Sequence, residues 1–194
     1  MIELANTLNL RMITDGSDRI AWLKARCRGV TASDAAILAT ERSVFTVAQS
    51  KRYGTPSIGN AYTDHGIQRE PVIAAWAHTH YSFSPSSALF HAKGELRHLA
   101  TPDGLTIGDG GELLLAEIKT TNKPWRSIPR NYLRQIWWQQ YVLGAERTLL
   151  IWEEHSNFVP VNPEPECRWI DRDEHEIALL VNRANQLLTL LHGH

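Results

Sequence analysis

Apolar residues recur at helical spacing in several parts of the chain. Between residues 17 and 26, Ile20 and Leu23 are three positions apart, as on one face of a helix. A second helix is expected to begin after Thr31, because Thr31 and Asp34 form a loose capping box, the polar pattern that closes a helix N-terminus. The predicted helices are 17–26, a segment that starts at 31, 61–80 after a loop over 50–60, 127 to a stop at Gly144, and 173–191.

Strand patterns begin in the middle of the chain. Residues 95–100 and 112–119 are expected to be strands, and the glycine-dense segment 101–111 between them is typical of a hairpin turn. Shorter strands are predicted over residues 148–152, 158–161 and 167–170. This mixture predicts an α/β fold, in which a central mixed β-sheet is flanked by helices. Since no repeat or low-complexity tract divides the chain, we expect a single domain over residues 1–194.

Composition narrows the class of protein. With 194 residues, of which 43% are hydrophobic and 21% charged, the chain has enough apolar material for a buried core, which excludes a disordered protein. The 20 Lys and Arg residues balance 21 Asp and Glu residues, so any contact with nucleic acid must come from local basic patches. Cys27 and Cys167 are too few for a four-cysteine metal site. The absence of a long apolar run predicts no membrane association and a cytoplasmic location.

A glutamate and a lysine lie two positions apart at the end of the predicted strand 112–119. Successive side chains of a strand point to opposite faces, so Glu117 and Lys119 are expected on the same face. A hairpin would bring Asp103 back beside Glu117. Two carboxylates and the main-chain carbonyl of Ile118 would suit Mg²⁺, with Lys119 orienting water and offsetting phosphate charge. The alternative interpretation is a solvated ion pair beside an ordinary turn.

A second polar cluster lies at the start of the predicted helix at residue 31. Thr31 and Ser33 lie where free N–H groups and the helix dipole favour an anion, and Arg26 adds a charge-assisted contact. Arg28 is a neighbouring candidate for the same role. The alternative is a capped helix with Arg26 paired to a surface acid.

Arginines also recur every four residues at positions 126, 130 and 134. Such a stripe predicts either a contact with the DNA backbone or a solvated helix face. In the predicted helix 61–80, Pro71 disfavours helical backbone at the preceding Glu70 and predicts a helix start or a kink there.

Four ordered motifs resemble those of a known family. Pro102-Asp103 with Glu117-x-Lys119 matches the PD-(D/E)xK nuclease signature. The segment from Trp22 to Ser33 resembles the W-x3-R-x4-T-A-S motif of the lambda exonuclease (YqaJ/RecE-like) branch of these nucleases. The same branch has G-x3-E and Y-x2-Q motifs, which are similar to Gly66–Glu70 and Tyr132–Gln135 in this sequence. Together the matches cover roughly residues 17–153.

The resemblance implies a PD-(D/E)xK restriction-endonuclease-like core and roles for the candidate residues. It implies that Glu70, Asp103 and Glu117 bind two Mg²⁺ ions, with the preference between Mg²⁺ and Mn²⁺ left open. Lys119 would assist the attacking water, and Gln135 would support the site or contact DNA. The segment with Arg26, Thr31 and Ser33 would receive the 5′-terminal phosphate.

The implied activity is Mg²⁺-dependent 5′-to-3′ degradation of linear double-stranded DNA to 5′-mononucleotides. The 3′ single-stranded tails would pass to a single-strand annealing protein during recombination. The resemblance also implies a homotrimeric ring around DNA and a phage or prophage enzyme that acts in the bacterial host cytosol. Two alternatives remain: an endonuclease with the same metal chemistry, and a catalytically silent scaffold that binds DNA ends.

Overall fold

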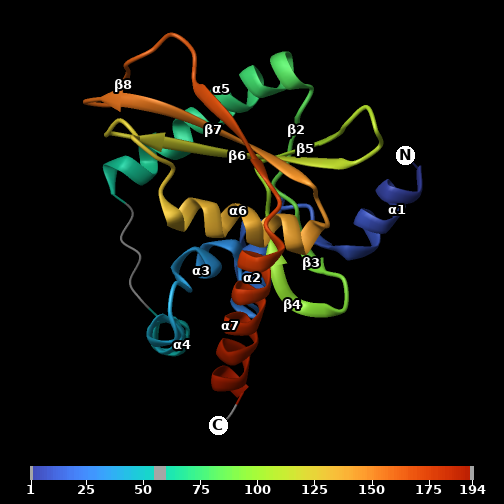
Figure 1. The fold of residues 1–194 in the computed structure, drawn as a ribbon. Helices are drawn as coiled ribbons and strands as arrows, with labels where there is room; N and C mark the ends of the chain where they lie inside the picture. The colour runs from blue at the N-terminus through green and yellow to red at the C-terminus, as the bar shows by residue number, and fades with distance from the viewer. Residues whose placement is uncertain (1, 55–59, 193–194) are drawn as a thin grey trace.

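The fold contains two β-sheets and helices that pack on both faces of the larger one (Figure 1). The computed structural model describes residues 2–54 and 60–192. The helices are α1 Ile2–Arg11, α2 Arg19–Cys27, α3 Ala32–Ile37, α4 Glu41–Tyr53, α5 Ala61–Tyr81, α6 Arg130–Leu143 and α7 Glu174–His192. The strands are β1 Met12–Thr14, β2 Ser84–Pro85, β3 Leu89–Ala92, β4 Glu95–Ala100, β5 Gly104–Ile107, β6 Leu113–Thr121, β7 Arg147–Ser156, β8 Val159–Pro160 and β9 Glu166–Asp171.

The larger sheet has the order β2-β5-β6-β7-β8, and β9 pairs with β7. β5 and β6 are antiparallel, whereas β6 and β7 are parallel with Glu117 opposite Leu150. A smaller antiparallel sheet contains β1, β3 and β4. The predicted fold class, a mixed sheet flanked by helices, is therefore confirmed.

The expected hairpin between strands 95–100 and 112–119 is wrong. β4 belongs to the smaller sheet, and the glycine-dense segment 101–111 contains a strand of its own, β5, which pairs with β6. Glycines made this segment read as a turn, although Leu105 and Ile107 pack against the core. Asp103 still comes to lie beside β6, because it directly precedes β5.

Capping boxes begin two of the helices. Thr31 caps α3 as predicted, and its capping box with Asp34 is complete. An equivalent box between Thr40 and Ser43 begins α4, a helix that was not predicted from the sequence. The end of α4 occupies the first part of the expected loop over 50–60. Residues 55–59 of that loop lie outside the described residues. The elements α1, β1, β2 and β3 were also not predicted from the sequence.

Pro71 neither begins nor ends a helix. α5 runs continuously through it from Ala61 to Tyr81, so the expected helix start at this position is wrong, while the expected kink stays a prediction. Proline removes one backbone hydrogen bond from a helix. The following turns bury Ile73, Ala74 and Ala77 against the sheet, and this packing offsets the lost bond.

Side chains of β6 alternate between two helical layers. Ala116 and Ile118 pack with residues of α5, whereas Leu113 and Leu115 join the cluster that contains Trp137 and other α6 residues. Glu117 therefore faces α6, on the same side as Leu115. Figure 1 shows α6 along one side of the large sheet and α5 on the other.

Two of the three arginines at 126, 130 and 134 contact neighbouring helices. Arg130 pairs with Glu176 of α7 at 2.7 Å, and Arg134 donates to the carbonyl of Ala36 at 2.8 Å. Both arginines thus tie α6 to neighbouring helices. Within residues 2–54 and 60–192, no helix is both long and apolar enough to span a membrane.

Candidate active site

Glu117 is a buried carboxylate with every oxygen in contact with a donor. Its side chain is 1% exposed, and Lys119 lies 2.5 Å from its Oε1. Gln135 donates to the same oxygen at 2.5 Å, while Gln139 donates to Oε2 at 2.7 Å. The predicted sharing of one strand face by Glu117 and Lys119 is confirmed, and α6 supplies the two amides that hold the carboxylate.

Asp103 lies against the next residue of β6. The Ile118 N–H donates to Asp103 Oδ2 at 2.7 Å, and the Asp103 N–H donates to the Ala116 carbonyl at 3.1 Å. β5 begins at Gly104, opposite Ala116, so Asp103 takes the position that a strand one residue longer at its start would occupy. The Ile118 carbonyl points to the same edge as its N–H, because both groups of a strand residue face the same neighbour.

The pKa shifts follow from the crowding of negative charge. Burial raises the pKa of Asp103 well above its ordinary value, and the Glu117 carboxylate raises it further, against the opposing effects of Lys119 and the Ile118 N–H. Burial would lower the pKa of Lys119, but Glu117 and Asp103 outweigh it and the net pKa is raised. Lys119 is therefore a protonated cation at neutral pH.

Glu70 reaches the same cluster from α5. Partial burial is the main cause that raises the pKa of Glu70, and the Glu117 carboxylate raises it further, while Lys119 lowers it. Glu70, Ile118 and Lys119 line a cleft of about 480 Å³ between α5 and α6, together with Asn60, Tyr62, Thr63, Gly66, Ile67, Thr120 and Tyr132. Glu70 and Asp103 also line a second cavity of about 310 Å³. Glu70 thus borders both open spaces, and Asp103 borders the second.

The donor set at this edge is all oxygen and suits a hard divalent cation. Among the described residues, no three His, Cys, Asp or Glu side chains are grouped so as to hold an ion as they stand. Lys119 and two amides contact the Glu117 oxygens. Burial and then the negative charge of Glu117 raise the pKa of both Glu70 and Asp103, and a divalent cation would offset this negative charge. The residues that would hold it are Glu70, Asp103, Glu117 and the Ile118 carbonyl.

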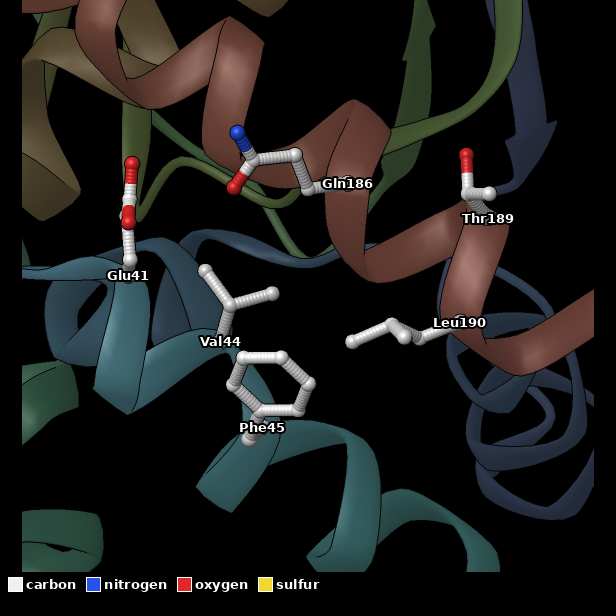
Figure 2. A pocket seen from close by; sticks show the side chains of 6 residues that line it. All are labelled: Glu41, Val44, Phe45, Gln186, Thr189 and Leu190. Atoms are coloured by element: carbon white, nitrogen blue, oxygen red, sulfur yellow. The ribbon is translucent and has the colours of Figure 1, made fainter.

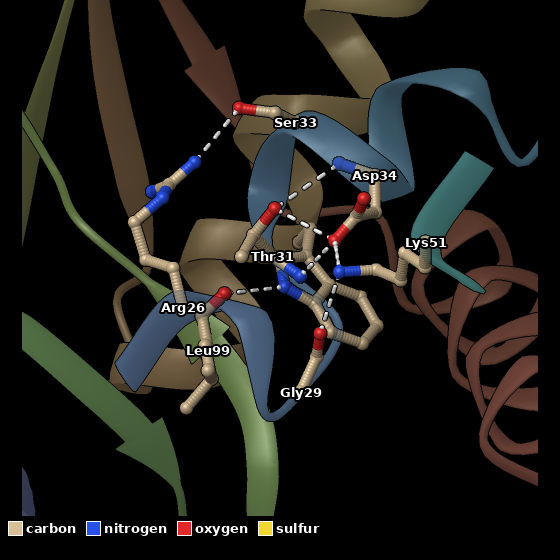
Figure 3. A network of polar contacts seen from close by, with 8 residues as sticks. Arg26, Gly29, Thr31, Ser33, Asp34, Lys51 and Leu99 are labelled. Atoms are coloured by element: carbon tan, nitrogen blue, oxygen red, sulfur yellow. Dashed lines mark hydrogen bonds and ion pairs between the residues drawn. The ribbon is translucent and has the colours of Figure 1, made fainter. Parts of the chain in front are cut away.

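The proposed phosphate pocket is only partly free to bind a ligand (Figure 3). The Thr31 hydroxyl donates to Asp34 Oδ2 at 2.8 Å and accepts from the Asp34 N–H. Its single hydrogen is therefore already donated within the capping box. Ser33 is exposed, and Arg26 donates to its hydroxyl at 3.4 Å. Arg26 also lies over the Trp22 ring at 4.3 Å. Arg28 is exposed at the end of α2.

Two polar residues of these clusters were not picked out as site candidates from the sequence. Lys51 of α4 contacts Asp34 Oδ2 and the Gly29 carbonyl, both at 2.9 Å, and so fixes the start of α3 (Figure 3). Gln139 is one helical turn beyond Gln135. Its signal was a pair of glutamines within the otherwise apolar middle of α6.

Another cavity, of about 380 Å³, lies between α4 and α7 (Figure 2). It is lined by Glu41, Val44, Phe45, Gln186, Thr189 and Leu190. It shares no residue with the carboxylate cleft and holds no cluster of catalytic side chains.

The sequence of this chain matches a known protein family. Residues 21–146, more than half of the chain, match the YqaJ-like viral recombinase domain. The chain belongs to the YqaJ-like viral recombinase domain family. The match includes Glu70, Asp103, Glu117, Lys119 and the α6 glutamines. A comparison with curated protein sequences gave no significant match.

Several solved structures share the fold of this YqaJ-like chain. The alkaline exonuclease LHK-Exo from Laribacter hongkongensis is 24% identical, with a TM-score of 0.70, and the match covers 89% of this chain and 92% of that chain. LHK-Exo in complex with dAMP gives a TM-score of 0.68 at 23% identity, with the same coverage. A phage-related exonuclease from Haemophilus somnus 129PT gives 0.64 at 13% identity, covering 84% of this chain and 93% of that one.

Proposed function

We propose that this protein is an Mg²⁺-dependent exodeoxyribonuclease that degrades one strand of linear duplex DNA from its 5′ end. The observation that carries the proposal is the convergence of Asp103, Glu117 and Lys119 at one edge of the sheet, with Glu70 beside them in an open cleft. Membership of a viral recombinase family, and a fold shared with exonucleases, support a nuclease that acts in recombination.

Each side chain has a separate task in this reaction. Lys119 keeps its proton at neutral pH, so it offsets negative charge on the phosphate and orients water rather than acting as a base. Glu70, Asp103 and Glu117 keep the site negative, and Gln135 holds one oxygen of Glu117. The chemistry that bound Mg²⁺ supplies here is polarisation of the phosphodiester and of the attacking water.

Arg26 and Ser33 bind the 5′-terminal phosphate in this proposal. An arginine beside an exposed hydroxyl offers charge-assisted hydrogen bonds to a terminal phosphate. Thr31 supports this pocket through its cap on α3, and Arg28 adds positive charge nearby. Recognition of the phosphate would explain a preference for DNA ends and a 5′-to-3′ direction.

The products and the assembly complete the proposal. Resection releases 5′-mononucleotides and leaves a 3′ single-stranded tail, which a single-strand annealing protein would receive in the host cytoplasm. Residues 1–194 would act as one exonuclease domain within a homotrimeric ring. Encirclement of the duplex would compensate for a net charge of only −1, which gives no general attraction to DNA.

The deciding experiment compares linear and closed DNA. End-labelled linear duplex and a covalently closed circle are incubated with the protein in Mg²⁺, in Mn²⁺ and in EDTA. We expect mononucleotides from the linear substrate only, with either metal and not in EDTA. Glu117→Gln should abolish the activity, whereas Glu166→Gln, at an exposed carboxylate of β9, should retain it.

Each alternative gives a different result. Cleavage of the closed circle would identify an endonuclease. Binding to linear ends without degradation in either metal would identify a DNA-end scaffold. Full activity of Glu117→Gln would refute the assignment of the site.

A further inference from the structure

Two adjacent glutamines lie fully buried in the middle of α6. Gln139 and Gln140 are each 0% exposed, among apolar neighbours that include Trp138. Burying an amide costs free energy unless it is hydrogen-bonded. Being adjacent on a helix, the two side chains point in different directions, so each has its own set of partners.

Gln140 bonds to residues outside the carboxylate cluster. Its Nε2 donates to Thr148 Oγ1 at 3.1 Å and to the Ile170 carbonyl at 3.0 Å. Both partners are in strands of the larger sheet, in β7 and β9. Gln140 therefore joins secondary-structure elements and contacts no carboxylate of the cleft.

Gln139 serves the carboxylates. Its Nε2 donates to Glu117 Oε2 at 2.7 Å, and Gln135, one turn earlier, donates to Oε1. Donors on both oxygens fix the rotation of the carboxylate plane. Without Gln139, only Oε1 would keep its partners, and the carboxylate would be free to turn about its last bond.

The same Gln139 amide also reaches the segment that carries Asp103. Its Nε2 donates to the Thr101 carbonyl at 3.3 Å, two residues before Asp103. One side chain thus connects β6, which carries Glu117, with the chain that delivers Asp103. The Asp103 carboxylate, which accepts from the Ile118 N–H, and the Asp103 N–H, which donates to the Ala116 carbonyl, also connect these two segments.

The orientation of the Gln139 amide is determined by its surroundings. Its Oε1 has no hydrogen-bond partner among the described residues, while its NH₂ faces a carboxylate and a carbonyl. A flipped amide would place its oxygen against two acceptors with no hydrogen between them. Gln139 must therefore present both donors to the site.

We propose that Gln139 is a positioning residue that sets the spacing of Asp103 and Glu117 for a shared divalent cation. This inference rests on the proposed function. Gln139 does not touch the reacting atoms. It acts through Glu117 and through the main chain before Asp103.

The adjacent glutamine provides a matched control. Gln139→Met and Gln140→Met each replace a buried amide that donates two hydrogen bonds, so both should lower the melting temperature by similar amounts. Gln139→Met should also lower kcat by about 10- to 100-fold, with KM for DNA nearly unchanged. Calorimetric titration of Mn²⁺ without DNA should show about tenfold weaker binding for Gln139→Met only. Gln139→Leu is a second variant, judged by the same comparison.

Several outcomes would overturn the inference. The inference would be refuted if the Gln139 variants kept the wild-type kcat and Mn²⁺ binding. It would also be refuted if Gln140→Met lost as much kcat and Mn²⁺ binding as Gln139→Met. Failure of both Gln139 variants to fold, while Gln140→Met folds, would assign Gln139 to the fold alone. A wild-type protein that binds Mn²⁺ with the expected dependence on Gln139 but degrades no DNA would refute the proposed function and leave the positioning role. Absence of both Mn²⁺ binding and nuclease activity would refute both.

Discussion

Replacing Lys119 with methionine removes the positive charge that faces Glu117 and Asp103 while keeping a long, unbranched side chain. The ammonium lies 2.5 Å from Glu117, whose side chain is 1% exposed, and the lysine itself is 21% exposed. Loss of one partner of a largely buried ion pair costs about 3 kcal/mol of folding stability. Loss of one preorganised charge at the phosphate costs roughly 100- to 1,000-fold in kcat.

Two measurements separate these effects. Urea denaturation in EDTA should show a lower free energy of unfolding for Lys119→Met than for the wild type. Addition of Mg²⁺ should stabilise this variant more than it stabilises the wild type. The reason is that a cation that binds the folded carboxylates partly replaces the missing charge. Steady-state degradation of 5′-phosphorylated linear duplex should give the loss in kcat. Lys119→Arg, which keeps the charge but changes its geometry, should retain most of the stability and lose much of the activity.

The assignment of Lys119 would be refuted by a Lys119→Met variant with kcat within threefold of the wild type. Equal stabilisation of both proteins by Mg²⁺ would show that the ammonium and the divalent cation do not respond to the same negative charge.

Three further predictions concern the end of the DNA, the metal and the core. Arg26→Ala should reduce the preference for 5′-phosphate over 5′-hydroxyl ends by about tenfold or more, since a charge-assisted hydrogen bond contributes ~1.5–3 kcal/mol. Glu70→Gln should raise the Mg²⁺ concentration for half-maximal activity by about tenfold. It should also shift the acidic limb of activity to lower pH, because Glu70 helps to raise the pKa of Asp103. Burial lowers the pKa of His98 from 6.5 to about 4, so its neutral form favours folding. Stability should be full above pH 6.5 and fall by up to about 3 kcal/mol as the pH drops from 6.5 to 4.

Each of these predictions has its own control. Lys93→Ala, an exposed cation between β3 and β4, should keep the end preference, and the same change as in Arg26→Ala would indicate a general charge effect. An unaltered Mg²⁺ requirement in Glu70→Gln would remove Glu70 from the set of ligands. Chemical denaturation of His98→Leu should show a flatter dependence on pH, and an unchanged slope would assign the effect to other groups.

The candidate site was largely predictable from the sequence because its signals are local. Alternation along a strand places Glu117 and Lys119 on one face whatever the rest of the chain does. A capping box also involves residues three apart, so Thr31 and Asp34 could be read directly. Asp103 was expected beside Glu117 from the order of the predicted strands, although through the wrong hairpin. Gln135 of α6 came from the resemblance of ordered motifs, which indicated residues but not contacts.

Distances between segments were not predictable in the same way. The pairing of β5 rather than β4 with β6 depends on the long-range choice of strand partner, and the glycines of 101–111 concealed it. The continuity of α5 through Pro71 depends on packing of later turns against the sheet, which outweighs a local preference.

The sequence by itself determined which charges share a strand, which residues cap helices, and which family the motifs resemble. Only the tertiary structure decided that α6 directs two amides at Glu117, that Gln139 also reaches the segment before Asp103, and that Arg130 and Arg134 bind neighbouring helices. The physical reason is that covalent geometry fixes where nearby side chains point, whereas contacts between distant segments depend on the burial of the whole core.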